Sequence, residues 1–467
     1  MLTDLSWLEV GQYFPPECER PRLERYAQNK LIFENEHGIV YKDQFKRLEK
    51  VLACFAEVIS YPIELNFQKK ISLKTADFLF GEQPDITAAD KDKNAATKKN
   101  AIITEIGEKS GLMASGYEGA IDCSRFGTTV LKIDVEDNKG VINITGPEFI
   151  YAVVEEGNRK KIKYWVFGWK NDTAKRLTVY IHEKGKYTRR VYECVDGLIK
   201  KLIDEIKDQP TGLDDFAIIP IHNVTTSDRV FGIDDYMDVD SIVSELEVRT
   251  AQISKILDIF ANPTPSGSAE ALVEDENGEH TFEAGNYYAR ENKDTPELEY
   301  VVWDASLDSN FKQIENLLKF LSVISEMGAA ILNADFEAGN IPSGSALRKL
   351  YINVLAKVAR MRNSFDVGLK KAIALASQVG YSQRLQPSDI SITWHDGLPI
   401  DPKEIAEIIA SRTGNKATLS QESALVQYDG MSPEAAQVEI EKVRMDEMAE
   451  NGMLNPSTLD DAEDDIE

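Results

Sequence analysis

Apolar residues recur at spacings of three and four in two stretches of the chain, and both stretches are predicted to be long helices. The first covers 311–331, with apolar positions at Phe311, Ile314, Leu317, Leu318, Leu321, Ile324 and Ile331. The second runs from about Ser345 to about Gln378, with apolar positions at Leu347, Leu350, Tyr351, Val354, Leu355, Val358, Met361 and Phe365. Lys319 and Glu326 interrupt the first apolar run, which excludes a membrane span.

The two helices are separated by a predicted break at 333–343. Gly339, Pro342 and the following Gly344 stand there among small polar residues, a composition typical of a chain that leaves helical geometry and turns. Between Gly344 and Lys371 there are seven Lys or Arg and a single acid, Asp366. On charge alone, this basic helix is interpreted as a solvated or ion-paired face.

The N-terminal half is predicted to contain helices followed by strands. Three helical segments are expected within 19–80, and Gly81 ends the last of them. The polar run 83–100 has no aromatic residue and no periodicity, so we expect a mobile surface loop, with a further helix over 100–118. From Gly127 to Val195, short alternating runs separated by turn residues predict an antiparallel sheet.

In the C-terminal half, a helix over 241–260 follows Asp240 and ends before Pro263. The insertion 263–305 then contains Asn277-Gly278 between two alternating runs, which predicts a β-hairpin. The long helices on either side of this insertion can therefore lie antiparallel. A strand within 389–394 and a helix beginning at Pro402 follow, then two shorter helices. From Asp446 to Glu467 there are nine acids and no Lys or Arg, and this tail is predicted to be disordered.

Composition narrows the class of protein. The chain has 467 residues with 79 acids against 53 bases, a net charge of -26, and it is predicted to be a helix-rich α+β protein. So acidic a chain is not expected to wrap tightly around nucleic acid, because phosphate binding depends on Lys and Arg. The four cysteines show no CxxC spacing, which suggests neither a zinc site nor a disulfide scaffold. The first fourteen residues lack the features of a secretory signal.

No catalytic signature is found. Gly339 and Gly344 have the spacing of a phosphate-binding loop, but Ser345 and Ala346 stand where Lys and Ser or Thr are required. HExxH and GxSxG motifs are absent, and the five histidines are scattered. We therefore predict no enzyme activity, no catalytic residue, no cofactor and no metal. An enzyme with an unrecognisable pair of carboxylates stays open as an alternative.

The order of these elements resembles the portal proteins of tailed bacteriophages, of the long-tailed siphophage type. Four local phrases resemble that family as well and occur in the family's order: ADFLFGE at 76–82, IPIHNVTTSDRVFGIDDYMDVDSIVSEL at 219–246, SGSALRKL at 343–350 and ITWHDGLPIDPKE at 392–404. The resemblance covers about residues 20–445. It implies a ring of twelve or thirteen copies at one capsid vertex, forming the channel for packaging and ejection of double-stranded DNA.

The resemblance also implies a division of the chain. The expected parts are a wing (1–237), a stem helix (238–262), a clip (263–305), a second stem helix (306–332), a tunnel loop (333–345), a wing and tunnel helix with a strand (346–399), and a crown with the acidic tail (400–467). The expected partners are the terminase large subunit and the head-to-tail adaptor, which dock at the clip, and the scaffold and major capsid proteins, with no membrane. Such a protein is assembled in the host cytoplasm and resides in the virion.

Residue roles follow from the same resemblance. The tunnel loop would present Phe336, Glu337, Asn340, Ile341 and Ser343 to the DNA. Lys312, Lys319, Arg348 and Lys349 are candidates for weak contacts with the duplex. For Lys312 and Lys319 the alternative is ion pairing between subunits, weighed equally with channel lining, and for Arg348 and Lys349 ion pairing is slightly favoured.

The apolar residues of the first long helix cover more than one narrow stripe. A single antiparallel partner would leave some of them exposed, so a neighbouring subunit is their expected cover. The predicted subunit interface comprises Leu317, Phe320, Leu321 and Ile324. A ring that binds only proteins, as a scaffold or adaptor without DNA passage, is the alternative function.

Overall fold

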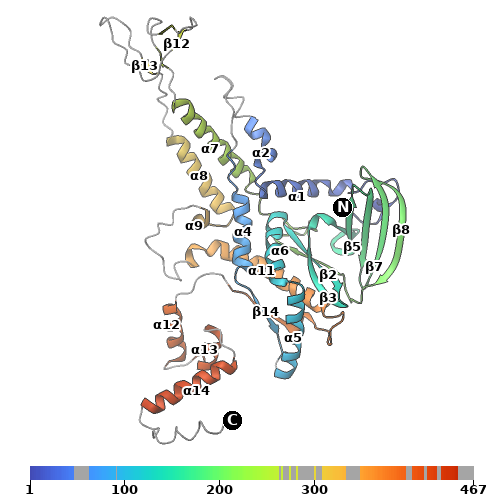
Figure 1. The fold of residues 1–467 in the computed structure, drawn as a ribbon, viewed down its shortest axis with the longest axis vertical. Coiled ribbons are helices and arrows are strands. Elements are labelled where there is room, and N and C mark those ends of the chain that lie inside the picture. The colour runs from blue at the N-terminus through green and yellow to red at the C-terminus, as the bar shows by residue number, and fades with distance from the viewer. Residues whose placement is uncertain are drawn as a thin grey trace. The chain divides into compact units, whose positions relative to one another are not determined.

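The computed structural model describes residues 1–46, 63–90, 92–261, 265–266, 273–274, 280–281, 299–300, 308–332, 348–395, 402–414, 418–428 and 433–450. The chain divides into two compact units. The first comprises Met1–Phe336 and Leu350–Gly397, and the second comprises Glu337–Lys349 and Leu398–Glu467. Helices and sheets are both present in the first unit (Figure 1), which confirms the predicted helix-rich α+β class.

The first unit contains the longer helices and most of the strands. Its α-helices are α1 (Arg20–Phe33), α2 (His37–Val40), α4 (Phe67–Phe80), α5 (Lys93–Lys109), α6 (Leu112–Phe126), α7 (Asp240–Ala261), α8 (Asp308–Ile324), α9 (Ala329–Leu332) and α11 (Ile352–Ala376). The N-terminus of α4 is capped by Asn66, whose side chain accepts a hydrogen bond from the Lys69 amide at 2.9 Å. At the end of α6, Gly127 has a φ of +76°. A side chain there would also collide with the backbone at Ile233, so this helix end requires glycine.

Two antiparallel sheets form the β part of the first unit. The smaller has the order β3-β2-β9 and the larger the order β4-β5-β6-β7-β8. Their strands are β2 (Thr128–Glu136), β3 (Lys139–Thr145), β4 (Ile150–Glu155), β5 (Asn158–Asn171), β6 (Arg176–Glu183), β7 (Lys186–Val195), β8 (Leu198–Pro210) and β9 (Ile218–His222). Asp137 and Asn138, both at positive φ, make the tight turn between β2 and β3. The antiparallel sheet predicted over 127–195 is thus confirmed and extended by β8 and β9.

Separate apolar cores stabilise these layers. The largest core joins α4, α5, α6, the small sheet, α11 and the adjoining ends of α7 and α8. A second core lies on one face of the five-stranded sheet, where Tyr151, Val179 and other strand residues pack against Trp7 and Phe14 from the N-terminal segment. The N-terminal residues are therefore part of the fold, because they cover a sheet face that would otherwise expose apolar side chains.

The prediction of a mobile loop over 83–100 is wrong. Residues Asp85–Ala88 form β1, which pairs antiparallel with β14 (Ile390–Thr393), and α5 already begins at Lys93. Lys99 holds this region in place by ion pairs with Asp90 at 2.9 Å and Asp389 at 2.8 Å. The strand is stabilised by a partner about 300 positions later in the chain, so no local pattern reveals it. The helix predicted over 100–118 is instead split between α5 and α6 at Gly111.

Four short strands are described in the segment between α7 and α8. β11 (Val273–Glu274) pairs with β12 (His280–Thr281), and β10 (Pro265–Ser266) pairs with β13 (Glu299–Tyr300). The first pairing confirms the predicted hairpin, although Asn277 and Gly278 themselves lie outside the described residues.

The second unit contains α12 (Pro402–Thr413), α13 (Gln421–Tyr428) and α14 (Pro433–Glu450). The helix start predicted at Pro402 is confirmed, and α13 packs against both α12 and α14. The prediction of a disordered tail from Asp446 is wrong for its first five residues, which form the end of α14, and the tail beyond Glu450 lies outside the described residues. In the described part of the chain, no helix has both the length and the apolar character needed to cross a bilayer.

Candidate functional site

Helices α7 and α8 lie side by side (Figure 1), which confirms the predicted pairing of the two long helices around the β insertion. The ends of these helices that adjoin the rest of the first unit are buried in the largest core. Val243 and Leu246 of α7 and Leu321 of α8 belong to that core, and Ile314 and Leu318 pack against it. The pair is therefore fixed to the first unit by apolar contacts at one end.

The opposite face of α8 is exposed. Phe320 is 58% exposed, Val323 73% and Ile324 45%. Lys312 and Lys319 are also exposed, and their spacing of seven residues places them on the same side of the helix as Val323. Within the described residues, neither lysine forms an ion pair. This face of α8 thus combines apolar side chains with positive charges that have no intrachain partner in the part of the chain described.

Leu321 requires a correction. The sequence assigned it to the subunit interface, but it is fully buried in the core of its own chain, so it has no surface to offer a neighbouring subunit. Leu317 is half-buried and packs against the same core. Phe320 and Ile324 are the two predicted interface residues that are exposed. The difference follows from helical geometry, because Leu321 lies on the side of α8 that packs into the core, while Phe320 lies one residue, or about 100°, away around the helix.

The helix predicted over 311–331 is not continuous, because it breaks between α8, which ends at Ile324, and α9. Glu326 has a φ of +59° and Gly328 a φ of +75°, both in the left-handed region, and Met327 between them is fully buried. The Glu326 carboxylate forms an ion pair with Arg360 of α11. This elbow fixes where the chain leaves α8, immediately before the segment that was predicted to be the tunnel loop.

Lys357 of α11 connects the elbow to the start of α7. Its ammonium group lies 2.9 Å from the Asp235 carboxylate and donates a hydrogen bond to the Ser325 carbonyl at 3.4 Å. Lys357 is buried, so its charge has left water and depends on these two partners. One side chain therefore ties together α11, the end of α8 and the segment that precedes α7.

Asp235 belongs to a buried polar hub, which we define as Asp234, Asp235 and Tyr236. Asp235 accepts hydrogen bonds from the Ser124 hydroxyl at 2.6 Å and the Asn223 amide at 2.8 Å. The Tyr236 hydroxyl lies 2.9 Å from that of Ser72. Asp234 forms an ion pair with Arg25 at 2.7 Å. The hub thereby connects α1, α4 and α6 to the residues just before α7.

Arg25 also pairs with Asp240, in the first turn of α7, at 2.6 Å. Burial raises the pKa of Asp240, while the charge of Arg25 opposes this effect. The two carboxylates and neighbouring hydrogen bonds raise the pKa of Arg25 above its ordinary value although burial acts in the opposite direction. Arg25 is thus a permanently charged link between α1 and the start of α7.

A second buried pair lies further along α7. The His37 Nδ1 is 2.5 Å from the Glu247 carboxylate, and both side chains are completely buried. The other ring nitrogen of His37 faces the Ile32 carbonyl at 3.1 Å. Because both nitrogens face acceptors, the imidazole is best satisfied as a charged donor at each. Burial lowers the pKa of His37, but the hydrogen bond and charge of Glu247 outweigh it, and the pKa is raised. Burial also raises the pKa of Glu247, more than its contact with His37 lowers it.

A family model described as "Phage portal protein, SPP1 Gp6-like" matches residues 17–451. The chain belongs to this family. It is a structural protein, the phage portal protein of the capsid vertex. The family predicted from the order of the elements and the four phrases is confirmed.

Among solved structures, the chain is similar to chains from GTA particles. One is a chain from the "Neck of native GTA particle computed with C12 symmetry", with a TM-score of 0.45 and 10% identity over 77% of this chain and 88% of that chain. Another is from the "Neck of empty GTA particle computed with C6 symmetry", with a TM-score of 0.47 and 12% identity over 79% and 90% of the two chains. A comparison with curated proteins gives no match.

The structure places the predicted site residues of this portal protein in three groups. Lys312, Lys319, Phe320 and Ile324 lie on exposed positions of α8. Arg348 and Lys349 are exposed in the second unit. The predicted tunnel-loop residues Phe336, Glu337, Asn340, Ile341 and Ser343 lie outside the described residues.

Sequence reasoning missed the buried charges that position the portal's paired helices. Arg25, Lys357 and Asp235 come from distant parts of the sequence, and each alone is indistinguishable from a surface charge. The phrase at 219–246 contains the three hub residues in a row, which is a signal for a functional or structural cluster. From sequence alone this phrase indicates a family resemblance but not a buried site.

Proposed function

We propose that the exposed face of α8 is where neighbouring copies of this portal protein meet and where the ring borders its channel. The observation that carries this proposal is the exposure of Phe320, Val323 and Ile324 on a helix whose other face packs against the largest core. Large exposed apolar groups gathered on one face are typical of an interaction surface. In a ring, the same helix face meets a different surface of the next copy, and the contact repeats until the ring closes.

The channel proposed for this ring conducts double-stranded DNA during packaging and ejection. Lys312 and Lys319 are seven residues apart, about 10 Å along a helix, so each would contribute one circle of positive charge per ring. The net charge of the chain is -26, and an acidic wall repels the duplex and keeps it centred. Few basic contacts are an advantage in a conduit, because every neutralised phosphate would hold the DNA more tightly.

The roles of the other segments follow from the family resemblance and are part of the same proposal. The stem comprises 238–262 and 306–332, and 333–345 forms the tunnel loop, with Phe336, Glu337, Asn340, Ile341 and Ser343 facing DNA. The clip at 263–305 docks the terminase large subunit and later the head-to-tail adaptor. The wing at 1–237 meets the capsid and scaffold proteins, and the crown occupies 400–467. Twelve or thirteen copies form the ring, which assembles in the host cytoplasm.

The interface is tested with a double variant, Phe320→Ser with Val323→Ser. Both residues are exposed in the single subunit, so the variant should fold normally but fail to form rings. Native mass spectrometry and circular dichroism measure the two properties separately. The control is Ile203→Ser on β8, since Ile203 is similarly exposed at 50% and lies far from α8 in the sequence. Rings of unchanged mass from the double variant would contradict the proposed interface.

Electron microscopy of the wild-type ring tests the conduit itself. A pore wide enough to admit a duplex supports DNA passage. A ring whose centre is closed or too narrow would instead support the alternative, a scaffold or adaptor that binds only proteins. A compact monomer at high protein concentration would contradict both.

A further inference from the structure

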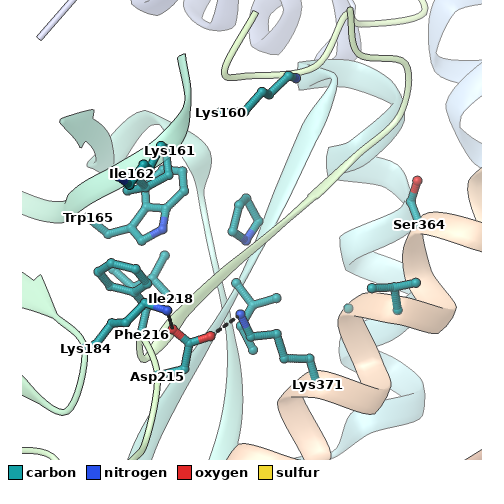
Figure 2. A pocket seen from close by; sticks show the side chains of 14 residues that line it. Lys160, Lys161, Ile162, Trp165, Lys184, Asp215, Phe216, Ile218, Ser364 and Lys371 are labelled. Carbon is teal, nitrogen blue, oxygen red and sulfur yellow. Dashed lines mark ion pairs between the residues drawn. The ribbon is translucent and has the colours of Figure 1, made fainter. Parts of the chain in front are cut away.

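A cleft in the first unit is lined by lysines, although the protein as a whole is acidic (Figure 2). It has a volume of about 520 Å³, within the range of sites that hold a small ligand or a short peptide segment. Its walls come from β5, the turn between β6 and β7, the segment 215–220 that includes the start of β9, and α11. Four of its lining residues are Lys160, Lys161, Lys184 and Lys371, and Asp215 is its only acid.

The carboxylate of Asp215 is shared between two ammonium groups. Its Oδ1 lies 3.1 Å from Lys184 Nζ, and its Oδ2 lies 2.7 Å from Lys371 Nζ, as Figure 2 shows for the pairing with Lys371. Burial tends to raise the pKa of Asp215, but hydrogen bonds from Lys371, the Phe216 amide and Lys184 lower it below its ordinary value. The carboxylate therefore stays ionised, and one negative charge serves two positive ones.

The other two lysines leave the cleft with a positive excess. Lys160 donates to neutral acceptors, the Thr225 hydroxyl at 3.2 Å and the Arg229 carbonyl at 2.9 Å. Lys161 pairs with Glu155 at 2.5 Å. Four ammonium groups thus face two carboxylates. An anion that enters the cleft meets an excess of two positive charges within a chain whose net charge is -26.

Apolar side chains form part of the same cleft. Trp165 and Phe216 are buried in its floor, and Val367 on α11 is 69% exposed at its edge. Gly368 beside it leaves no room for a side chain, because an added Cβ would lie 2.6 Å from Ile221. The cleft is therefore bounded by a close approach of α11 to β9, with an apolar floor and a cationic rim.

We propose that this cleft binds an acidic peptide segment of a partner protein. Carboxylates of the segment would contact Lys160, Lys184 and Lys371, and an apolar side chain between them would rest against Val367. The concave shape and the apolar floor favour an extended peptide over duplex DNA, which requires a broad row of cations rather than a narrow cleft with Asp215 at its centre. The site is distinct from the conduit proposed above, since none of its residues belongs to α7 or α8.

Fluorescence anisotropy of the full-length protein tests the site with a short labelled peptide of alternating Glu and Leu. We expect binding that weakens as salt is added, and no binding of the counterpart with Gln in place of each Glu. The double variant Lys160→Gln with Lys184→Gln should bind about fivefold to tenfold more weakly, as expected for two partly exposed ion pairs. Lys98→Gln, an exposed lysine on α5, is the matched control and should bind as the wild type does.

Asp215→Asn provides a second, independent variant. It removes the negative charge in the cleft, so the Glu peptide should bind about threefold more tightly, whereas a cleft that only supports the fold would show no gain. Failure of the wild-type protein to bind the Glu peptide, or binding unchanged by the lysine variants, would overturn the proposal. Binding of duplex DNA that is lost in the same lysine variants would overturn it as well, because the cleft would then be a nucleic-acid site.

Discussion

At the base of α7, charged side chains are partly or fully buried and find their partners within the chain, whereas on the outer face of α8 apolar side chains are exposed. Asp240 and Glu247 of α7 pair with Arg25 and His37. Phe320 and Val323 of α8 are largely exposed. The two helices lie side by side, yet the charges of one are paired within the chain and the outer face of the other keeps apolar side chains exposed. The first arrangement favours one subunit geometry, and the second is the surface that we propose a neighbouring copy covers.

The buried charges stabilise that geometry only when their partners are in place. Taking a charge out of water costs several kcal/mol, and the cost is offset only when the partner and its hydrogen bonds are in place. The hub therefore stabilises one arrangement of α1, α11 and α7 and penalises others. The exposed face of α8 carries no such penalty, because its residues remain in water until a neighbour covers them.

The largest expected effect comes from removing one of the buried charges. Lys357→Met removes the ammonium group that faces Asp235 and the Ser325 carbonyl. Asp235 then remains buried without its charged partner, and the free energy of unfolding should fall by about 3–5 kcal/mol. Urea denaturation followed by circular dichroism measures this change.

A double variant separates the charge from the packing. Lys357→Met combined with Asp235→Asn leaves no uncompensated charge, so it should recover part of the stability lost in the single variant. A loss below about 0.5 kcal/mol for Lys357→Met, the size of an ordinary surface substitution, would mean that the hub does not hold α11 as described.

The next effect compares two neighbouring positions on α8. Leu321→Ala creates a cavity in the largest core, because Leu321 is fully buried, and should lower the free energy of unfolding by about 2–5 kcal/mol. Val323→Ala removes a side chain that is 73% exposed and should change it by less than about 0.5 kcal/mol. Equal losses at both positions would contradict the assignment of one face to the core and the other to a neighbour.

The residues of α8 also show how far sequence alone can go. The spacing of Leu317, Phe320, Leu321 and Ile324 predicted the helix correctly, because a period of three and four is a local property. It could not separate Leu321 from Phe320, since adjacent apolar residues differ only in what the fold places opposite them. The tunnel-loop residues lie outside the described part, so their predicted roles stay predictions.

Long-range partners explain most of what the sequence did not predict. β1 was predicted to be a loop because its four residues, Asp85–Ala88, are too few to give a strand signal within a polar run without β14. Arg25, Lys357 and Asp235 form buried pairs across more than a hundred positions, and charged residues are normally expected on the surface. The family, by contrast, could be predicted from the order of elements, which does not depend on any one contact.

A change of pH tests the buried pair of His37 and Glu247 without any substitution in the core. The pKa of His37 is raised above its ordinary value of 6.5, so its contribution to stability is fully present below pH 6.5 and is lost as the pH rises through the raised pKa. The charged groups that face His37 are Glu247 of α7 and Glu64 of the segment before α4. Urea denaturation from pH 6 to pH 9 should show a decline in the wild type.

The control for this pH series is His37→Gln, which cannot titrate. Its free energy of unfolding should be lower at pH 6 and should lack the part of the decline that comes from His37. The outer face of α8 has no histidine, so ring assembly of the wild type should not change with this titration. Identical pH profiles for the wild type and His37→Gln would show that the imidazole is not charged in the folded subunit.

The smallest expected effect concerns the elbow that joins the two regions. Glu326 adopts a φ of +59°, which costs a residue with a side chain about 1 kcal/mol relative to glycine. Its ion pair with Arg360 is between side chains that are about half exposed, and such pairs contribute little. Glu326→Gly should therefore leave the free energy of unfolding unchanged or raise it by up to about 1 kcal/mol, whereas Glu326→Val should lower it because a β-branched residue fits the left-handed region poorly. A marked loss of stability in Glu326→Gly, matched by an equal loss in Arg360→Ala, would show that the ion pair rather than the backbone conformation holds the elbow.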